Sequence, residues 1–534
     1  MTDNIEKRKK VSLYILLFVT FSCIAFTGLN GSLQNVDEVL YARVSRETLE
    51  HRSWLIQYKD GEAWFHKSPM LFWTVMLSYK SFGVSDFSAK LPSAIAGVVS
   101  AFMIFFISRK IFQSEKAGII GGLIYLTSLQ VYVSTHQVAI DSLLAMYLLV
   151  TLLFTIKGIV DKKSWLLLAG ISNGLVFLTK SILGLVVPAS LFLYIIIEKK
   201  WRMFHYFIAL FVISIGVASP YFLSVYRRIP DIFVKSFLFD NLFDRFYSKS
   251  GIPFGRLLYR LGYGIAYYTI FLLLFTIPFT GGIVALFNRR GEQCAVRDIL
   301  WKGSSKLLSL YFLITLFGYS LLSGKWPHWT VPMIPPVVIF LGYVLSTVRN
   351  RNIYLSLSGF SCAAVILILT LYGVLGSKYP TYKDVFIGLA ILYGIFCIAG
   401  LFLFIRRTGT EKGVFSMAVG FFVGFTIFTA VTVPLDFNRD IKTFSNVVYD
   451  DHSPLVVIGS KEVDEGNKKT VTIWYLKMRS VHYNSLDRFL KSAKNVQRGT
   501  YFIYYKDYTE KLRELYPTFH TLKMGTIWNL GRVE

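Results

Sequence analysis

The sequence has few charged residues and few cysteines for its length. Charged side chains make up 17% of the 534 residues and hydrophobic ones 54%, whereas a soluble domain carries about 25% charged residues. This composition excludes an ordinary soluble protein and predicts an integral membrane protein. The four cysteines, Cys23, Cys294, Cys362 and Cys397, have neither the spacing of a zinc site nor plausible disulfide partners.

Acidic residues are also scarce. The chain has 32 of them against 57 lysines and arginines, which gives a net charge of +25. Most of the excess lies in short loops beside hydrophobic runs, where it fits anionic lipid headgroups and membrane topology. We therefore exclude nucleic acid as a partner and expect membrane lipids instead.

Long hydrophobic runs are abundant. A helix needs about 20 apolar residues to cross the ~30 Å hydrocarbon layer, and the chain offers about thirteen such runs. The expected spans are 11–29, 88–107, 117–134, 142–157, 164–179, 182–197, 203–223, 262–287, 307–323, 328–347, 353–376, 383–405 and 413–433. No small-residue cleavage site follows the first run, so we expect it to be retained as a span.

The short basic loops predict the orientation. With thirteen spans they all fall on the side of the N-terminus, and Lys and Arg are enriched in cytoplasmic loops. These segments are EKRKK at the N-terminus, Arg109-Lys110, 161–163, 198–202, Arg289-Arg290, 349–351 and Arg406-Arg407. We thus expect a transmembrane domain, 1–435, whose loops 30–87 and 224–260 lie outside, together with a C-terminal domain, 436–534.

The C-terminal domain has a different pattern. Runs at 455–459, 471–475 and 500–504 are rich in β-branched and aromatic residues, and Lys-rich helical stretches at 485–494 and 507–515 separate them. Strands alternating with helices predict a small extracytoplasmic α/β domain. It contains no phosphate loop, dinucleotide fingerprint or metal-binding spacing.

The charged segment 35–69 is the strongest functional signal. Polar loops at membrane level persist only where they are buried in protein or line a wet cavity, so we expect an active-site loop. Asn35 suits a helix N-cap, and Asp37 and Tyr41 share one face of the helix that follows. Glu38 stands at the capping-box position, so it either caps the helix or takes part in chemistry.

Basic residues suited to an anionic headgroup recur at the predicted outer surface. Lys67 follows His66 between aromatic residues and a proline; it either binds phosphate as a point charge or snorkels to the membrane surface. Lys180 interrupts an apolar stretch and is either directed to phosphate or the tip of a hairpin. The loop 224–260 carries five arginines, including Arg245, and arginine binds phosphate bidentately.

Two further segments complete the candidate site. His136 and Asp141 flank a short outer loop, and Asp141 falls in the first turn of a helix, where the helix dipole favours a carboxylate. The run 325–336 contains Lys325, His328, Trp329 and four prolines. Spaced prolines free backbone carbonyls and predict a broken helix that lines a cavity.

In this order, these motifs resemble the aminoarabinose transferases, bacterial enzymes that move a sugar from a polyprenyl phosphate to lipid A. Asp37-Glu38-Val39-Leu40-Tyr41-Ala42 is similar to the family's Asp-Glu-x-x-Tyr-Ala, and residues 65–73 to its Phe-x-Lys-Pro-Pro-Leu-x-Tyr-Trp. Residues 82–93, Asp141, 177–181 and 325–335 match further motifs in register. Leu40, His66 and Trp329 replace the family's usual arginine, acidic residue and tyrosine.

The resemblance implies an inverting glycosyltransferase of the GT-C class in the bacterial inner membrane. Its donor would be an undecaprenyl-type phosphate sugar and its acceptor lipid A or another glycoconjugate. The alternatives are a protein O-glycosyltransferase and a lipid-linked sugar transporter or flippase. The sequence leaves the sugar, the acceptor and any divalent metal open. The candidate catalytic residues are Asp37, Asp141 and Glu38, and the candidate carrier and substrate ligands are Lys67, Tyr41, Arg245, Lys180, His66, Lys325, His328 and Trp329.

Overall fold

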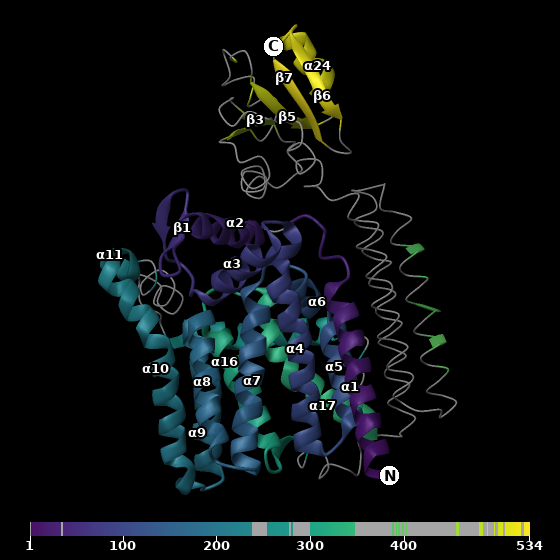
Figure 1. Ribbon diagram of the computed structural model, residues 1–534, viewed down its shortest axis with the longest axis vertical. Helices are drawn as coiled ribbons and strands as arrows, with labels where there is room; N and C mark the ends of the chain where they lie inside the picture. The colour runs from purple at the N-terminus through teal and green to yellow at the C-terminus, as the bar shows by residue number, and fades with distance from the viewer. Residues whose placement is uncertain are drawn as a thin grey trace.

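A computed structural model provides the fold, shown in Figure 1. In the N-terminal two thirds it describes residues 2–33, 36–235, 237, 254–276, 279–280 and 299–347. Isolated positions follow between 387 and 402, and the C-terminal part contributes 455–458, 480–483, 489, 496, 500–505, 508–524 and 528–533. The expected spans 353–376 and 413–433, and all but isolated positions of 383–405, lie outside the described residues.

The described membrane part is a bundle of apolar helices. Six helical segments are long and apolar enough to cross a membrane, or up to seven with one bent pair, so thirteen spans are not confirmed. The helices are α1 (Thr2–Phe26), α4 (Asp86–Phe112), α5 (Glu115–Thr127), α6 (Leu129–Thr135), α7 (Ile140–Val160), α8 (Trp165–Lys180), α9 (Val186–Ile197), α10 (Phe204–Arg228), α13 (Phe254–Phe275), α16 (Ser305–Leu321) and α17 (Ile334–Thr347).

Two of these segments are broken where they approach the same end of the bundle. Helices α5 and α6 meet at Ser128 with a bend of 69°. After α8 the chain passes through the 3-10 helix η1 (Ser181–Leu185) and reverses. The Asn173 side-chain amide donates to the Gly184 carbonyl at 2.9 Å, and in a straight helix eleven residues would separate these groups by about 16 Å. The chain at η1 therefore folds back against α8, and the division of this stretch into the two spans 164–179 and 182–197 stays a prediction.

Small residues let the helices of this bundle approach closely. A Cβ atom added to Gly342 of α17 would lie 2.3 Å from the Ala117 carbonyl oxygen of α5. The facing position on α5, Gly121, would place a Cβ 3.1 Å from the Val338 carbonyl. Small residues at such a contact allow backbone-to-backbone packing in membrane helices. This contact fixes α17 and, through it, the broken segment that precedes it.

The basic segments Arg109-Lys110, 161–163 and 198–202 lie at the end of the bundle beside the N-terminus (Figure 1), and those at 289–290, 349–351 and 406–407 lie outside the described residues. Lys110, at the end of α4, pairs with Asp161, which follows α7. Lys306, in the first turn of α16, pairs with Glu198, which follows α9. These pairs place separate basic loops on the same side, as the charge pattern predicts.

Residues 36–82 cover the opposite end (Figure 1). Helix α2 (Val36–Glu50) leads into the antiparallel strands β1 (Gln57–Lys59) and β2 (Glu62–Trp64), and α3 (Met70–Phe82) follows. The Trp73 indole donates to the Trp54 carbonyl at 2.6 Å, and the Tyr221 hydroxyl of α10 donates to the Leu55 carbonyl at 3.1 Å. The expected loop 30–87 is thus a folded cap fastened to the bundle.

The C-terminal part contains a mixed five-stranded sheet in the order β4-β3-β5-β7-β6. Strand β3 (Leu455–Ile458) pairs in parallel with β4 (Ser480–Tyr483) and β5 (Tyr501–Tyr505), whereas β7 (Trp528–Val533) pairs antiparallel with β5 and β6 (Phe519–Met524). Helix α24 (Thr509–Leu515) precedes β6. The expected strands at 455–459 and 500–504 and the helix at 507–515 are confirmed, and 471–475 lies outside the described residues.

Candidate active site

A cavity of about 770 Å³ lies at the capped end of the bundle. Its walls come from segments far apart in the chain: the start of α2, the loop before α3, the turn between α6 and α7, the reversal after α8, the end of α16, and the 3-10 helix η4 (Pro327–Met333) with the residue before it. Among its lining residues are Asp37, Glu38, Tyr41, His66, Lys67, Asp141, Lys180, His328 and Trp329. The structure therefore brings together nine of the eleven residues that the sequence nominates.

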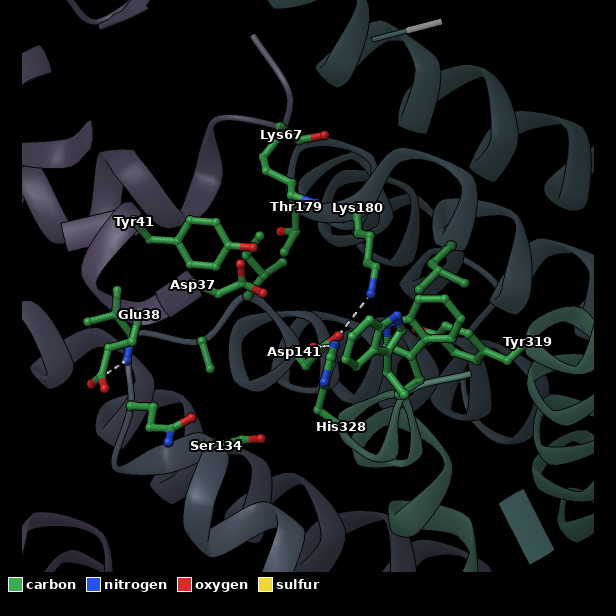
Figure 2. Close-up of a pocket in the computed structure, with 18 of the residues that line it drawn as sticks. Asp37, Glu38, Tyr41, Lys67, Ser134, Asp141, Thr179, Lys180, Tyr319 and His328 are labelled. Carbon is green, nitrogen blue, oxygen red and sulfur yellow. Dashed lines mark hydrogen bonds and ion pairs between the residues drawn. The ribbon is translucent and has the colours of Figure 1, made fainter. Parts of the chain in front are cut away.

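Helix α2 contributes one carboxylate and one phenol to this cavity. Asp37 lies in its first turn, where the exposed helix N-terminus favours a negative charge, and it is exposed to the cavity. Tyr41, one turn later, is 7% exposed, and its ring packs edge-on against Phe72 of α3 at 5.9 Å between centroids. Figure 2 shows Asp37 beside Tyr41, below Lys67. The expected shared face of Asp37 and Tyr41 is confirmed.

Glu38 lines the same cavity but is 2% exposed. Its Oε1 accepts the Val138 backbone N–H at 3.3 Å and lies 3.8 Å from the Lys90 ammonium of α4. These partners belong to other elements, whereas a capping box would direct Glu38 to the residue before its own helix. That residue, Asn35, lies outside the described residues. The catalytic role of Glu38 stays a prediction.

The loop that carries His66 and Lys67 is anchored on both sides of the cavity. The Ser68 hydroxyl lies 3.1 Å from the Ser181 hydroxyl at the reversal after α8. The Gln57 side-chain amide donates to the Lys67 carbonyl at 3.3 Å. Anchoring of the Lys67 backbone leaves its long side chain to extend over the cavity beside Thr179 (Figure 2). Lys67 thus lines the cavity, and its role as a phosphate ligand stays a prediction.

Asp141 and Lys180 form the second charged group of the site. Lys180 Nζ donates to Asp141 Oδ1 at 3.0 Å, and His328 Nε2 lies 3.8 Å from Asp141 Oδ2 (Figure 2). The Lys180 ammonium also lies 5.5 Å from the ring centroids of Tyr319 and Trp329, which stack on each other. Aromatic faces attract a cation at such distances. Lys180 is thus the last residue of α8 and a charged wall of the cavity.

Two nominated residues are not placed in this cavity. Lys325 is not among its described lining residues; its ammonium donates to the Ser320 carbonyl at 2.9 Å and to the Leu322 carbonyl. Burial lowers the pKa of Lys325, and the charge of Arg260 lowers it further. Arg245 lies outside the described residues. The ligand roles of both residues stay predictions. The described residues contain no cluster of three metal-binding side chains, and the sequence left a divalent metal open.

Residues that the sequence did not nominate also shape the site. Tyr319 lies in the apolar helix α16 and gives no local signal, because a tyrosine in a hydrophobic run is ordinary. Lys90 did give a signal, since a lone ammonium within an expected membrane span is costly and often functional. It lies next to Glu38 and is 4% exposed.

Comparisons with known proteins agree with this architecture. Residues 66–223 match the family described as Dolichyl-phosphate-mannose-protein mannosyltransferase. The Undecaprenyl phosphate-alpha-4-amino-4-deoxy-L-arabinose arabinosyl transferase of Edwardsiella ictaluri is 25% identical over 415 residues, which cover 73% of this chain and 72% of that relative. This similarity confirms the resemblance to the aminoarabinose transferases that the sequence motifs indicate. A second transferase of this name, from Sodalis glossinidius, is 25% identical over 64% of this chain and 59% of its own length.

The fold is also that of a solved structure. The crystal structure of ArnT from Cupriavidus metallidurans bound to undecaprenyl phosphate matches with a TM-score of 0.75, at 18% identity, over 98% of both chains. The expected class, a polytopic helical membrane protein of GT-C type with a small C-terminal sheet domain, is therefore confirmed.

Proposed function

We propose that the chain is a membrane glycosyltransferase that moves a sugar from a polyprenyl phosphate carrier to a lipid A-type or other cell-envelope acceptor. The observation that carries this proposal is one cavity in which two carboxylates, Asp37 and Asp141, face two lysines, Lys67 and Lys180. These residues lie on four separate segments, so the fold gathers them. Relatives that share the fold are named for a transferase that uses undecaprenyl phosphate-linked aminoarabinose.

The lysines suit a carrier phosphate as the leaving group. As the bond between the anomeric carbon and the phosphate oxygen breaks, negative charge grows on the phosphate, and fixed cations nearby stabilise it. Lys67 reaches the cavity from an anchored loop, and Lys180 lies 3.0 Å from Asp141 on another wall. We assign the phosphate first to Lys67. Lys180 also binds the phosphate if the phosphate dianion takes the place of Asp141 as its partner. An arginine such as Arg245 is a further candidate ligand of the phosphate.

Asp37 suits the role of general base. The acceptor hydroxyl would attack the anomeric carbon from the face opposite the phosphate, and its proton would pass to Asp37 while polyprenyl phosphate leaves. A base must be accessible to the acceptor. Asp37 is exposed in the cavity, whereas Glu38 and Asp141 are buried, 2% and 7% exposed. Direct displacement inverts the anomeric centre.

The reaction would take place on the outer face of the bacterial inner membrane. The cavity lies at the end of the bundle opposite the paired basic loops. Because basic loops are retained in the cytoplasm, the cavity and the C-terminal sheet then face outward. An extracytoplasmic site fits a lipid-linked donor, which carries its own activated sugar.

A protein acceptor is the second candidate function. It is favoured by the match of residues 66–223 to a family named for protein mannosylation. A transporter is less suited to the structure, because transporters place ionisable residues near the membrane midplane, and here the charged groups of the cavity lie at the capped end.

The test is transfer by the purified protein in liposomes containing a panel of polyprenyl phosphate sugars, with lipid A or an unfolded polypeptide as acceptor. We expect one sugar to reach lipid A with release of polyprenyl phosphate and no transfer to the polypeptide. Mass spectrometry of lipid A and glycoproteins from a deletion strain identifies the natural acceptor. Loss of a protein-linked glycan alone would replace lipid A by protein, and movement of donor between leaflets without transfer would contradict the enzyme.

A further inference from the structure

A lysine buried in α4 lies at the junction of the two walls that carry Asp37 and Asp141. Lys90 Nζ donates to the Gly31 carbonyl at 2.7 Å and to the Ser32 carbonyl at 3.1 Å. It also lies 3.8 Å from Glu38 Oε1. An ammonium has three donors and suits a point surrounded by oxygens. Lys90 therefore holds in place both the connection between α1 and α2 and Glu38, the residue next to Asp37.

The same turn of α4 also holds the segment before Asp141. Glu38 Oε1 accepts the Val138 N–H at 3.3 Å, so the Lys90–Glu38 pair extends to the turn between α6 and α7. Three residues after Lys90, Ser93 Oγ accepts the Ala139 N–H at 3.1 Å. Residues three apart share a helix face. One face of α4 thus contacts both the start of α2 and the start of α7.

Burial of this pair is costly, and stability alone does not explain it. Lys90 is 4% exposed and Glu38 is 2% exposed. Replacing a buried ion pair by apolar residues is often neutral or stabilising, whereas removing one partner leaves an uncompensated charge. A pair of this kind is useful where the geometry of its surroundings must be unique. Here the surroundings include Asp37 and Asp141, the other two carboxylates of the cavity.

We propose that Lys90 and Glu38 are positioning residues, which hold the start of α2 and the 136–139 turn together and so fix Asp37 and Asp141 relative to each other. Glu38 then acts through Asp37 and Val138 rather than as a base. This inference rests on the proposed function for its kinetic consequences only. The contacts themselves are measurable without turnover.

The test compares Lys90→Met, Glu38→Gln, the double variant and Lys90→Arg. Lys110→Met is the control, because Lys110 also forms an ion pair from α4, but with Asp161 at the opposite end. A misplacement of about 1 Å costs ~10²-fold in rate, so we expect kcat to fall about 10- to 100-fold in each single charge-removing variant. The KM for the donor should change little, because Lys67, which we assign first to the carrier phosphate, lies on a loop that is anchored separately.

The pattern among the variants separates positioning from folding. The double variant leaves no orphan charge, so it should fold even if Lys90→Met does not. Its kcat should match that of the single variants rather than the product of their losses, because the residues act as a unit. Lys90→Arg keeps the charge and should restore most of the rate. Lys110→Met should keep wild-type kcat.

Hydrogen exchange tests the inference without any substrate. Amides in the peptide 136–141, including the Val138 N–H that Glu38 accepts, should exchange faster in the double variant and not in Lys110→Met. Unchanged exchange, wild-type kcat in the double variant, or losses that multiply would each overturn the inference. If the wild-type protein transfers no sugar from any donor, the proposed function fails, and the exchange result alone decides whether Lys90 and Glu38 position these segments.

Discussion

Replacing Asp37 by asparagine tests the residue that we place nearest the chemistry. The substitution keeps the size of the side chain and removes its charge and basicity. General-base help contributes about 10²–10⁴-fold in rate, which corresponds to about 2.7–5.4 kcal/mol of barrier at 1.36 kcal/mol per factor of ten. The expected loss of folding stability is smaller than this change in the barrier. Asp37 is an exposed first-turn carboxylate, and its interaction with the helix dipole is worth about 0.3–1 kcal/mol.

Activity and stability should therefore separate in this variant. We expect kcat for sugar transfer from a polyprenyl phosphate to fall at least a hundredfold in liposomes, while the melting temperature in detergent changes only slightly. Glu115→Gln is the matched control, because it removes a first-turn carboxylate from α5 at the other end of the bundle; it should keep full activity. An Asp37→Asn enzyme with near-normal kcat would remove Asp37 from the mechanism, and Asp141 would become the leading base.

Three further predictions follow from charge and packing. A reporter fused after Pro434 should behave as extracytoplasmic; a cytoplasmic signal would refute the orientation. Lys67→Ala should abolish transfer with normal protein levels, because the carrier phosphate loses its cation, and Lys67→Arg should keep part of it; full activity in Lys67→Ala would favour snorkelling. Gly342→Ala should lower the melting temperature, since overpacking costs about 1–3 kcal/mol and the new Cβ would lie 2.3 Å from a carbonyl oxygen, whereas Gly318→Ala, with open space, should not.

Much of this site could be predicted because its residues break a simple local pattern. Charged side chains are rare in a hydrophobic chain, so the charged segment 35–69 that holds Asp37 and Lys67 stands out, as do Asp141 and Lys180 among apolar neighbours. The prolines after Lys325 likewise predicted the broken segment that is observed as η4 followed by α17.

The pairing of these residues could not be read from the sequence. Ser68 and Ser181 are 113 positions apart, and Glu38 and Val138 are 100 apart. Such contacts depend on how helices pack, which apolar periodicity alone does not specify. Lys325 makes contacts that its motif does not predict: its ammonium donates to neighbouring backbone carbonyls, and its ligand role stays a prediction. Tyr319 was missed because an aromatic residue in an apolar helix looks like any other packing residue.

At the reversal of the chain after Lys180, the residues that set the size of the cavity differ from those that carry its charge. Ile182 and Leu183 of η1 line the cavity, yet the reversal itself is held from below by the contact between Asn173 and Gly184. Substitutions at these two apolar positions can therefore enlarge or narrow the space available to a sugar without altering a carboxylate or an ammonium. A fold built in this way can change its preferred substrate by small steps while its reaction chemistry stays intact.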